Sequence, residues 1–335
     1  MIGVCSNISA KIFGKNLYND EKRKFCQLMY KGVLHKRIEL NKEGVIEMTK
    51  EAKEMKNSDK FDVVIGNPPY KGKGRGLHLR FLELAFNFLK ESGSLSFIHP
   101  ATWLISKKNN QFYSYMRNLV SKSVIDFTFL NPDTVFGVEM SMPVVITNLI
   151  KNNGLKEYKV IDKIFGNSWF YSSIHDINIF GNYPEYFSLC DKILPVASKN
   201  SLHDNIGKNG KYYVILPKIT GHLDKKSLYR DDFFTLCNSV THISKNKDKN
   251  GLIFGFNSKK EAVNFINYIK SKFARFALSI YKFNKNIHMG ELRAVPWLDF
   301  SKYYTDKNLC DMFGVTSKEL VFIDTIIPDY HKDKK

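Results

Sequence analysis

Short apolar runs alternate with helical stretches over residues 1–150, a pattern typical of a parallel α/β sheet. Residues 61–65 predict a compact buried strand after a polar segment, and residues 95–98 predict another. Between them, apolar side chains recur at helical spacing over residues 79–91. We expect further strands at residues 2–4, 124–130 and 143–149, and a helix near residues 9–18.

The pattern changes after residues 151–154 to irregular, aromatic segments rich in Asn, Gly and Lys. One long helix is predicted over residues 261–283, because apolar side chains form a continuous stripe from Ala262 to Ile280. Lys270, Lys272 and Arg275 are expected on or beside its polar face. Such charges are typical of a solvated face, and they also suit contact with DNA.

Two further helices are predicted near the C-terminus. Residues 306–313 form one, ended by Gly314, and Thr316 and Glu319 have the capping-box spacing for the next. We therefore expect two domains, over residues 1–152 and 153–330.

The charge of the chain indicates an anionic partner. Its 335 residues suggest about two domains. They contain 51 Lys and Arg against 33 Asp and Glu, a net charge of +18. Nucleic acid is the commonest partner of so basic a protein. A chain rich in Lys, Asn, Ile and Phe is also what an AT-rich genome would encode, so charge alone does not decide the function.

Other features exclude several classes of protein. Charged residues make up 25% and hydrophobic residues 43% of the chain, which is ordinary for a folded protein. No apolar run reaches the roughly 18 residues of a membrane span, and no signal peptide is evident. The five cysteines are scattered without a CxxC pair, so we expect no metal site and a reducing, cytoplasmic location. They are Cys5, Cys26, Cys190, Cys237 and Cys310.

The chemistry is carried by Asn67-Pro68-Pro69-Tyr70, directly after the strand at residues 61–65. The carboxyl ends of parallel strands are where open α/β sheets bind ligands. The two prolines fix the backbone and remove two N–H groups. The Asn67 side-chain oxygen and the Pro68 carbonyl are then suited to accept both hydrogens of one exocyclic amino group.

Such an arrangement activates a poor nucleophile. The lone pair of an aromatic amine such as adenine N6 is delocalised into the ring, and two well-placed acceptors draw the nitrogen toward tetrahedral geometry. Positioning and fixed dipoles then favour attack on a nearby methyl sulfonium without a strong general base. Tyr70 offers a flat face for stacking, and the base has to leave the duplex first.

Residues 61–70 (FDVVIGNPPY) resemble the catalytic motif of S-adenosylmethionine-dependent adenine-N6 DNA methyltransferases. The resemblance is to the methylase part of type II restriction–modification enzymes whose target-recognition domain follows the catalytic domain. Residues 93–104 and 136–149 resemble its later segments, and residues 258–262 and 295–327 resemble its recognition region.

This resemblance implies a Rossmann-like α/β methyltransferase sheet followed by a mixed α+β target-recognition domain. It implies S-adenosylmethionine as cofactor and double-stranded DNA as partner. Asn67, Pro68, Pro69 and Tyr70 would be catalytic, with Asn67 also at the cofactor. Phe136 would be the second wall of the base pocket, opposite Tyr70.

Part of the family pattern is missing. The chain opens at what resembles the second strand, near Gly3, without the glycine-rich loop and the acidic residue that approach the cofactor. Asp62 is not assigned to the cofactor. We therefore expect an N-terminally truncated catalytic domain, with a second chain as a possible source of the missing segment. The alternative function is a DNA-binding specificity subunit, or the remnant of a split methylase, without catalysis of its own.

Several features of the sequence allow two interpretations. Protein-glutamine and some RNA-guanine methyltransferases use similar motifs, but they rarely carry a long basic domain after the motif. The glycine-rich loop with Lys71, Lys73 and Arg75 suits DNA phosphates or is a solvated loop. His99 is expected to be structural. Trp103, Trp169 and Trp297 are expected in the core, and no nuclease motif is evident.

Overall fold

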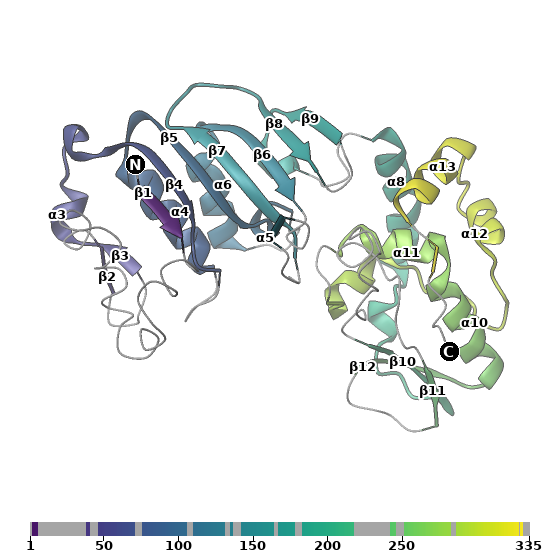
Figure 1. Ribbon diagram of the computed structural model, residues 1–335. Coiled ribbons are helices and arrows are strands. Elements are labelled where there is room, and N and C mark those ends of the chain that lie inside the picture. The colour runs from purple at the N-terminus through teal and green to yellow at the C-terminus, as the bar shows by residue number, and fades with distance from the viewer. Residues whose placement is uncertain are drawn as a thin grey trace. The chain divides into compact units, whose positions relative to one another are not determined.

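The computed structural model describes most of the chain, in thirteen stretches. They are residues 2–5, 38–40, 46–70, 76–105, 110–130, 135–136, 142–163, 167–177, 183–217, 242–245, 251–282, 286–327 and 329–330. The chain forms two compact units (Figure 1). The first consists of Met1–Asn131 and Val144–Ile179, and the second of Pro132–Pro143 and Phe180–Lys335.

The first unit is built on a seven-stranded mixed sheet. Its order is β1-β4-β5-β7-β6-β8-β9. The pairs β1–β4, β4–β5 and β6–β8 are parallel, and the other pairs are antiparallel. The strands are β1 (Ile2–Cys5), β4 (Phe61–Asn67), β5 (Leu89–Pro100), β6 (Val124–Leu130), β7 (Val144–Ile150), β8 (Tyr158–Asp162) and β9 (Asn167–Tyr171).

Short helices accompany this sheet, and Figure 1 shows α4 and α6 against one face of it. A two-stranded hairpin forms a separate small sheet. The helices are α3 (Lys50–Lys53), α4 (Leu77–Phe88), α5 (Thr102–Ile105), α6 (Gln111–Val120), η2 (Asn57–Asp59) and η3 (Ile174–Asp176), and the hairpin strands are β2 (Ile38–Leu40) and β3 (Ile46–Met48).

The two faces of the sheet differ in burial. Alternate side chains, such as Val64, Phe97 and Phe127, are at most 4% exposed and form the core. On the other face of β4, Val63 and Ile65 are 37% and 43% exposed. Across β5, β7 and β6 that face carries a hydrogen-bonded row. The Ser96 hydroxyl donates to the Asn148 oxygen at 2.7 Å, and the Asn148 amide donates to Asp126 at 2.9 Å.

Several predicted elements are confirmed in the first unit. Strands form at β1, β4, β5, β6 and β7, and β6 spans the predicted residues 124–130. The predicted helix over 79–91 is confirmed up to Phe88, but the chain enters β5 at Leu89. Within β5, a Cβ on Gly93 would lie 3.1 Å from the Phe61 oxygen of β4, so a glycine suits the close approach of the two strands. The helix predicted near residues 9–18 lies outside the described residues.

The second unit combines a small sheet with several helices. β10 lies between β11 and β12 in a three-stranded antiparallel sheet. The strands are β10 (Tyr212–Pro217), β11 (His242–Ser244) and β12 (Gly251–Phe256). The helices are α8 (Pro184–Lys199), η4 (His203–Asn205), α10 (Lys259–Lys270), α11 (Lys272–Ser279), η5 (Met289–Ala294), α12 (Asp306–Met312) and α13 (Ser317–Ile326).

The two C-terminal helices are as predicted. α12 ends before Gly314, whose φ of +60° suits a glycine, and α13 begins with the capping box of Thr316 and Glu319. Glu319 also pairs with Lys192 of α8, with 2.6 Å between the ammonium nitrogen and Oε2. This ion pair and the hydrogen bonds to Thr316 lower the pKa of Glu319 to about 2, against the opposing effect of burial.

The prediction of one long helix over residues 261–283 is wrong in one respect. Its stripe divides into α10 and α11 at Ser271, where the backbone is extended at φ −62° and ψ 150°. The Ser271 hydroxyl accepts a hydrogen bond from the Ala274 N–H and so caps α11. Arg275 is consequently 0% exposed and does not lie on a polar face, which removes it as a DNA contact in this structure.

The division into units also differs from the expected boundary after residue 152. β8 and β9 follow that point in the sequence, but β8 pairs in parallel with β6 of the first sheet. Hydrogen bonding along the sheet thus keeps the chain in the first unit up to Ile179. Among the described residues, no helix is long and apolar enough to span a bilayer.

Candidate functional site

The candidate site lies at the carboxyl end of β4, where Asn67 is the last strand residue. β1 and β5 flank β4 in parallel, with Cys5 opposite Asn67 and Phe97 opposite Gly66. The carboxyl ends of three parallel strands therefore meet beside the Asn67–Tyr70 motif. This is the edge of an open α/β sheet at which ligands bind.

Asn67 contributes one of several buried polar atoms that lack a partner among the described residues. Its side-chain oxygen Oδ1 is buried, and it has no hydrogen-bond partner among the described residues. Leaving a buried acceptor unpaired costs about 1–3 kcal/mol, so native structures rarely retain one without a reason. An amino group that enters the site would supply the missing donor.

Tyr70 is fixed against the neighbouring strand. Its hydroxyl donates a hydrogen bond to the Ile98 carbonyl at the end of β5, at 3.3 Å. Burial raises the pKa of Tyr70 to about 12, so the phenol is neutral at physiological pH. Tyr70 is therefore suited to offer a ring face, and not to act as a base. The sequence did not single out Ile98, although neighbouring parallel strands predict that their ends meet.

His99 is buried beneath this edge, on the opposite side of β5 from Ile98. Its Nε2 lies 2.9 Å from the Thr147 hydroxyl of β7, and its Nδ1 lies 3.2 Å from the Pro100 carbonyl. A carbonyl only accepts, so Nδ1 carries the proton and Nε2 accepts from Thr147. His99 is thus a structural link between β5 and β7, as expected from the sequence.

A second histidine, which the sequence analysis did not identify, stacks on His99. The ring centroids of His78 in α4 and His99 are 5.9 Å apart, and those of His99 and Trp103 are also 5.9 Å apart. Burial lowers the pKa of His78 to about 4, and burial together with His78 lowers that of His99 to about 3. Both rings are therefore neutral at pH 7 and pack the floor of the site.

The expected tryptophan positions are mostly internal. Trp103 is 0% and Trp169 is 9% exposed. Trp297 stacks on Phe256 with 5.7 Å between ring centroids and an interplanar angle of 7°. All three belong to aromatic packing within their own unit.

Other predicted site residues are not tested by the structure. Lys71, Lys73 and Arg75 lie outside the described residues. Phe136 is 40% exposed and belongs to the second unit, so its place opposite Tyr70 stays a prediction. Lys270 packs over the ring of Tyr330, with Nζ 4.9 Å from the centroid.

The described residues fit a cofactor site only in part. The parallel edge and the unpaired Asn67 oxygen suit a ligand, but Asp62 is turned to Lys90, at 2.9 Å. That hydrogen bond to Lys90 lowers the pKa of Asp62, and the carboxylate is engaged there. Residues 6–37, which follow β1 at this edge, lie outside the described residues.

Comparison with known proteins gives a class for this part of the chain. Residues 6–136 match the model of the Eco57I restriction-modification methylase family. The matched range includes β4, the Asn67–Tyr70 motif and β5. This match supports a restriction-modification methyltransferase. No curated protein sequence matches the chain significantly.

Solved structures show more distant likenesses. The type IIG restriction endonuclease BpuSI is 11% identical with a TM-score of 0.36, over 79% of this chain and 50% of that one. The type I restriction enzyme EcoKI M protein is 16% identical with a TM-score of 0.27, over 34% and 26%. A putative class I S-adenosylmethionine-dependent methyltransferase from Listeria monocytogenes is 19% identical with a TM-score of 0.25, over 35% and 38%. The chain spans half or less of each of these proteins.

Proposed function

We propose that the first unit is the catalytic part of an S-adenosylmethionine-dependent DNA methyltransferase that modifies adenine N6, and that the second unit contributes target recognition. The observation that carries this proposal is the buried Oδ1 of Asn67 at the carboxyl edge of β4, which has no hydrogen-bond partner among the described residues. The family match over residues 6–136 supports the reaction class.

In the proposed mechanism, Asn67 Oδ1 accepts one N6–H of a flipped adenine, and the Pro68 carbonyl accepts the other. Both are fixed by β4 and by the two prolines, so little reorganisation is needed as charge develops on N6. When bound, S-adenosylmethionine supplies an electrophilic methyl group. The other proposed contacts with the base are the aromatic rings of Tyr70 and Phe136.

Tyr70 and Phe136 are proposed to stack on the two faces of the base. The hydrogen bond from the Tyr70 hydroxyl to the Ile98 carbonyl anchors the tip of one ring against β5, which restricts where the base can stack. Orientation of this kind lowers the barrier by restricting the bound base to reactive geometries. No described residue has to act as a strong base, because N6 loses its proton readily once it carries the methyl group.

The test is transfer of tritium from labelled S-adenosylmethionine to unmethylated duplex DNA. We expect incorporation into N6-methyladenine by the chain, and none by Asn67→Ala. Asn87→Ala, on the partly exposed surface of α4, is the matched control and should retain activity. Equal transfer by Asn67→Ala and the control would refute the mechanism.

The same assay separates the alternatives. Methylation of a glutamine-containing protein, without methylation of DNA, would favour a protein-glutamine methyltransferase. DNA binding without transfer or measurable S-adenosylmethionine binding would favour a specificity subunit that acts with a second chain. Transfer by this chain alone would show that no second chain is needed.

A further inference from the structure

The segment from Asn200 to Lys211, here named the 200–211 loop, is an unusually well-fixed surface element of the second unit. It joins α8 to β10 and contains the short helix η4. Its backbone is hydrogen-bonded on two sides. Leu202 N–H donates to the Val295 carbonyl at 2.9 Å, and Gly207 N–H donates to the Ile253 carbonyl at 2.7 Å.

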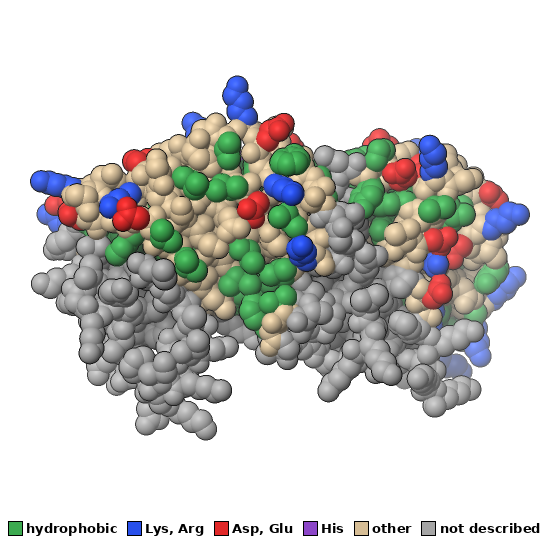
Figure 2. All heavy atoms as spheres, turned by 45° about the horizontal axis from the view of Figure 1, so that its top comes forward, with side chains coloured by type: hydrophobic (Ala, Val, Ile, Leu, Met, Phe, Trp, Pro, Cys, Tyr) green, Lys and Arg blue, Asp and Glu red, His purple; other side chains and the backbone are tan. Residues whose placement is uncertain are grey.

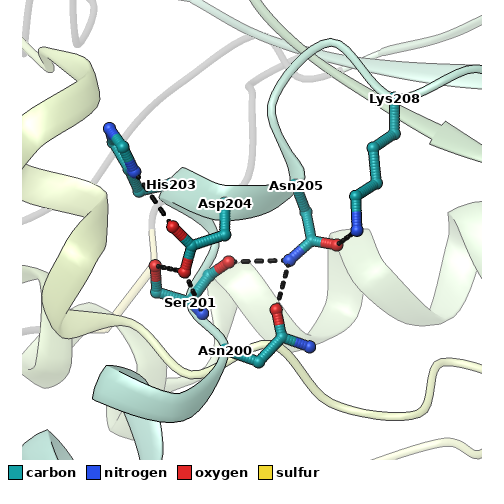
Figure 3. Close-up of polar contacts among 6 residues, drawn as sticks. All are labelled: Asn200, Ser201, His203, Asp204, Asn205 and Lys208. Atoms are coloured by element: carbon teal, nitrogen blue, oxygen red, sulfur yellow. Dashed lines mark hydrogen bonds and ion pairs between the residues drawn. The ribbon is translucent and has the colours of Figure 1, made fainter.

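Asn205 is the centre of the polar contacts within the loop (Figure 3). Its amide nitrogen donates to the Asn200 side-chain oxygen at 2.7 Å and to the Ser201 carbonyl at 2.8 Å. Its amide oxygen accepts from the Lys208 ammonium at 2.7 Å. Asn205 is 2% exposed, so a buried amide fixes the ammonium group at the tip of the exposed Lys208 side chain.

Close backbone approaches fix the second half of the loop. A Cβ on Gly210 would lie 2.3 Å from the Phe256 nitrogen, and one on Gly255 would lie 2.3 Å from the Lys208 oxygen. Only glycine fits at both positions. Lys211 N–H donates to the Phe256 carbonyl at 2.8 Å, which holds the loop against the end of β12.

This arrangement brings basic residues from two segments to one region. Lys208 and Lys211 of the loop are exposed, and Lys259 and Lys260 are exposed at the start of α10, three and four residues after Phe256. On the face shown in Figure 2, basic side chains of the described residues are mostly scattered among polar and apolar atoms.

The nearby carboxylates are engaged in turns. Asp204 accepts from the Ser201 hydroxyl at 2.7 Å and its N–H at 2.9 Å, and these bonds lower its pKa to about 2. Glu261 accepts from the Asn257 and Ser258 N–H groups in the capping box of α10. The lysines are therefore not paired with these acids and keep their charge for an external anion.

We propose that the 200–211 loop and the start of α10 form a contact surface for the phosphate backbone of duplex DNA, with Lys208, Lys211, Lys259 and Lys260 as its cations. The assignment of DNA as the polyanion rests on the proposed function. A pre-ordered loop binds phosphates with a smaller loss of conformational freedom than a mobile one. Phosphate contacts of this kind set the orientation of a protein on its site.

The test compares two triple variants with equal change in charge. Lys208→Gln/Lys211→Gln/Lys260→Gln alters the proposed surface, and Lys302→Gln/Lys307→Gln/Lys318→Gln alters exposed lysines elsewhere in the second unit. Binding to a mixed-sequence 30-base-pair duplex is followed by fluorescence anisotropy over a series of NaCl concentrations. Thermal melting checks that both variants fold.

We expect the first variant to bind at least about tenfold more weakly at moderate salt, because each lost phosphate contact removes about 0.9 from the slope of log K against log salt. The slope should fall by about 2 to 3, and the control should keep the wild-type slope. Equal effects of the two variants, or no effect of either, would overturn the proposed surface.

Methyl transfer distinguishes this proposal from the proposed function. If the surface is correct, the first variant keeps transfer at saturating DNA and low salt, with a raised KM, whereas Asn67→Ala binds DNA and transfers nothing. Wild-type transfer with unchanged DNA binding by the first variant would refute the surface alone. Absence of DNA binding by the wild-type chain would refute both.

Discussion

At the scale of single residues, Asn67 combines its proposed role in the site with a buried polar atom that costs stability. Its buried Oδ1 forms no hydrogen bond among the described residues, although Asn67 lies at the end of a paired strand. An acceptor without a partner in the described part of the chain is suited to bind a substrate donor without first breaking another bond. This is the pre-organisation that a methyl-transfer site requires.

Asn67→Ala should therefore remove activity without lowering thermal stability. The substitution removes an unpaired buried acceptor that costs about 1–3 kcal/mol, which offsets the packing lost with the amide. We expect a melting temperature equal to or above that of the wild type, measured by circular dichroism. A fall of several degrees would show that the Asn67 side chain has a stabilising partner, contrary to the structure.

The site residues differ in how far the sequence could reveal them. The motif from Asn67 to Tyr70 is evident from its unusual composition and its place after an apolar strand. His78 could not be identified, because its role depends on a ring stacked from another element. The burial of Arg275 could not be predicted either. Helical periodicity does not show that α11 is a separate helix, nor which of its faces is buried.

At the scale of elements, α4 packs on β5 next to the carboxyl end of β4, where the candidate site lies. His78 and His99 stack in the interior, and His99 links β5 to Thr147 of β7. Both imidazoles are neutral because burial disfavours their charged forms. Stability of the first unit should therefore depend on pH through these two rings.

The sign of this dependence follows from proton binding. On folding, the pKa of His78 falls from 6.5 to about 4 and that of His99 from 6.5 to about 3. At pH values between the folded and unfolded pKa of each histidine, the unfolded chain therefore binds more protons than the folded chain. Their contribution is present above about pH 6.5 and is lost as the pH falls. We expect each histidine to reduce the free energy of unfolding by about 2 kcal/mol between pH 7 and pH 5.

Urea unfolding of wild type and His78→Leu over this pH range measures the effect. The difference between the two proteins isolates the histidine contribution from that of the carboxylates. The variant should lose less stability on acidification than the wild type. Parallel pH profiles would contradict the buried, neutral state of His78.

The interruption between α10 and α11 shows what periodicity misses. The apolar stripe continues through Ser271 because both helices bury the same kind of side chain, so the sequence predicted one helix. The Ser271 hydroxyl donates to the Tyr268 carbonyl at 2.6 Å and accepts from the Ala274 N–H at 3.1 Å. One residue thus ends α10 and begins α11. By contrast, the capping box of α13 is local in sequence and could be recognised directly.

Ser271→Ala should destabilise the second unit, because it removes the cap of α11 and a hydrogen bond to α10. The expected loss is about 1–2 kcal/mol, a fall in melting temperature of roughly 2–8 °C. Ser271→Thr keeps a hydroxyl and should recover part of the lost stability. If alanine is as stable as serine in differential scanning calorimetry, Ser271 does not determine the helix boundary.

At the scale of the whole molecule, the two units suggest a division of labour. The first contains the parallel edge with Asn67, and the second contains the basic 200–211 loop. Composition indicated an anionic partner, but it could not locate the surface that binds it, because the fixed position of Lys208 depends on Asn205 and on glycines of two segments. The change in composition also could not locate the boundary between the two units. β8 lies after that change in the sequence but joins the first sheet by pairing with β6.

The most direct test of the central claim is methyl transfer to duplex DNA by this chain, with Asn67→Ala beside it. Purified protein, tritiated S-adenosylmethionine and unmethylated DNA are incubated, and the digested nucleosides are separated. The proposed mechanism predicts label in N6-methyladenine for the wild type and none for Asn67→Ala. Label of equal amount in both proteins, or only in another nucleoside, would contradict it.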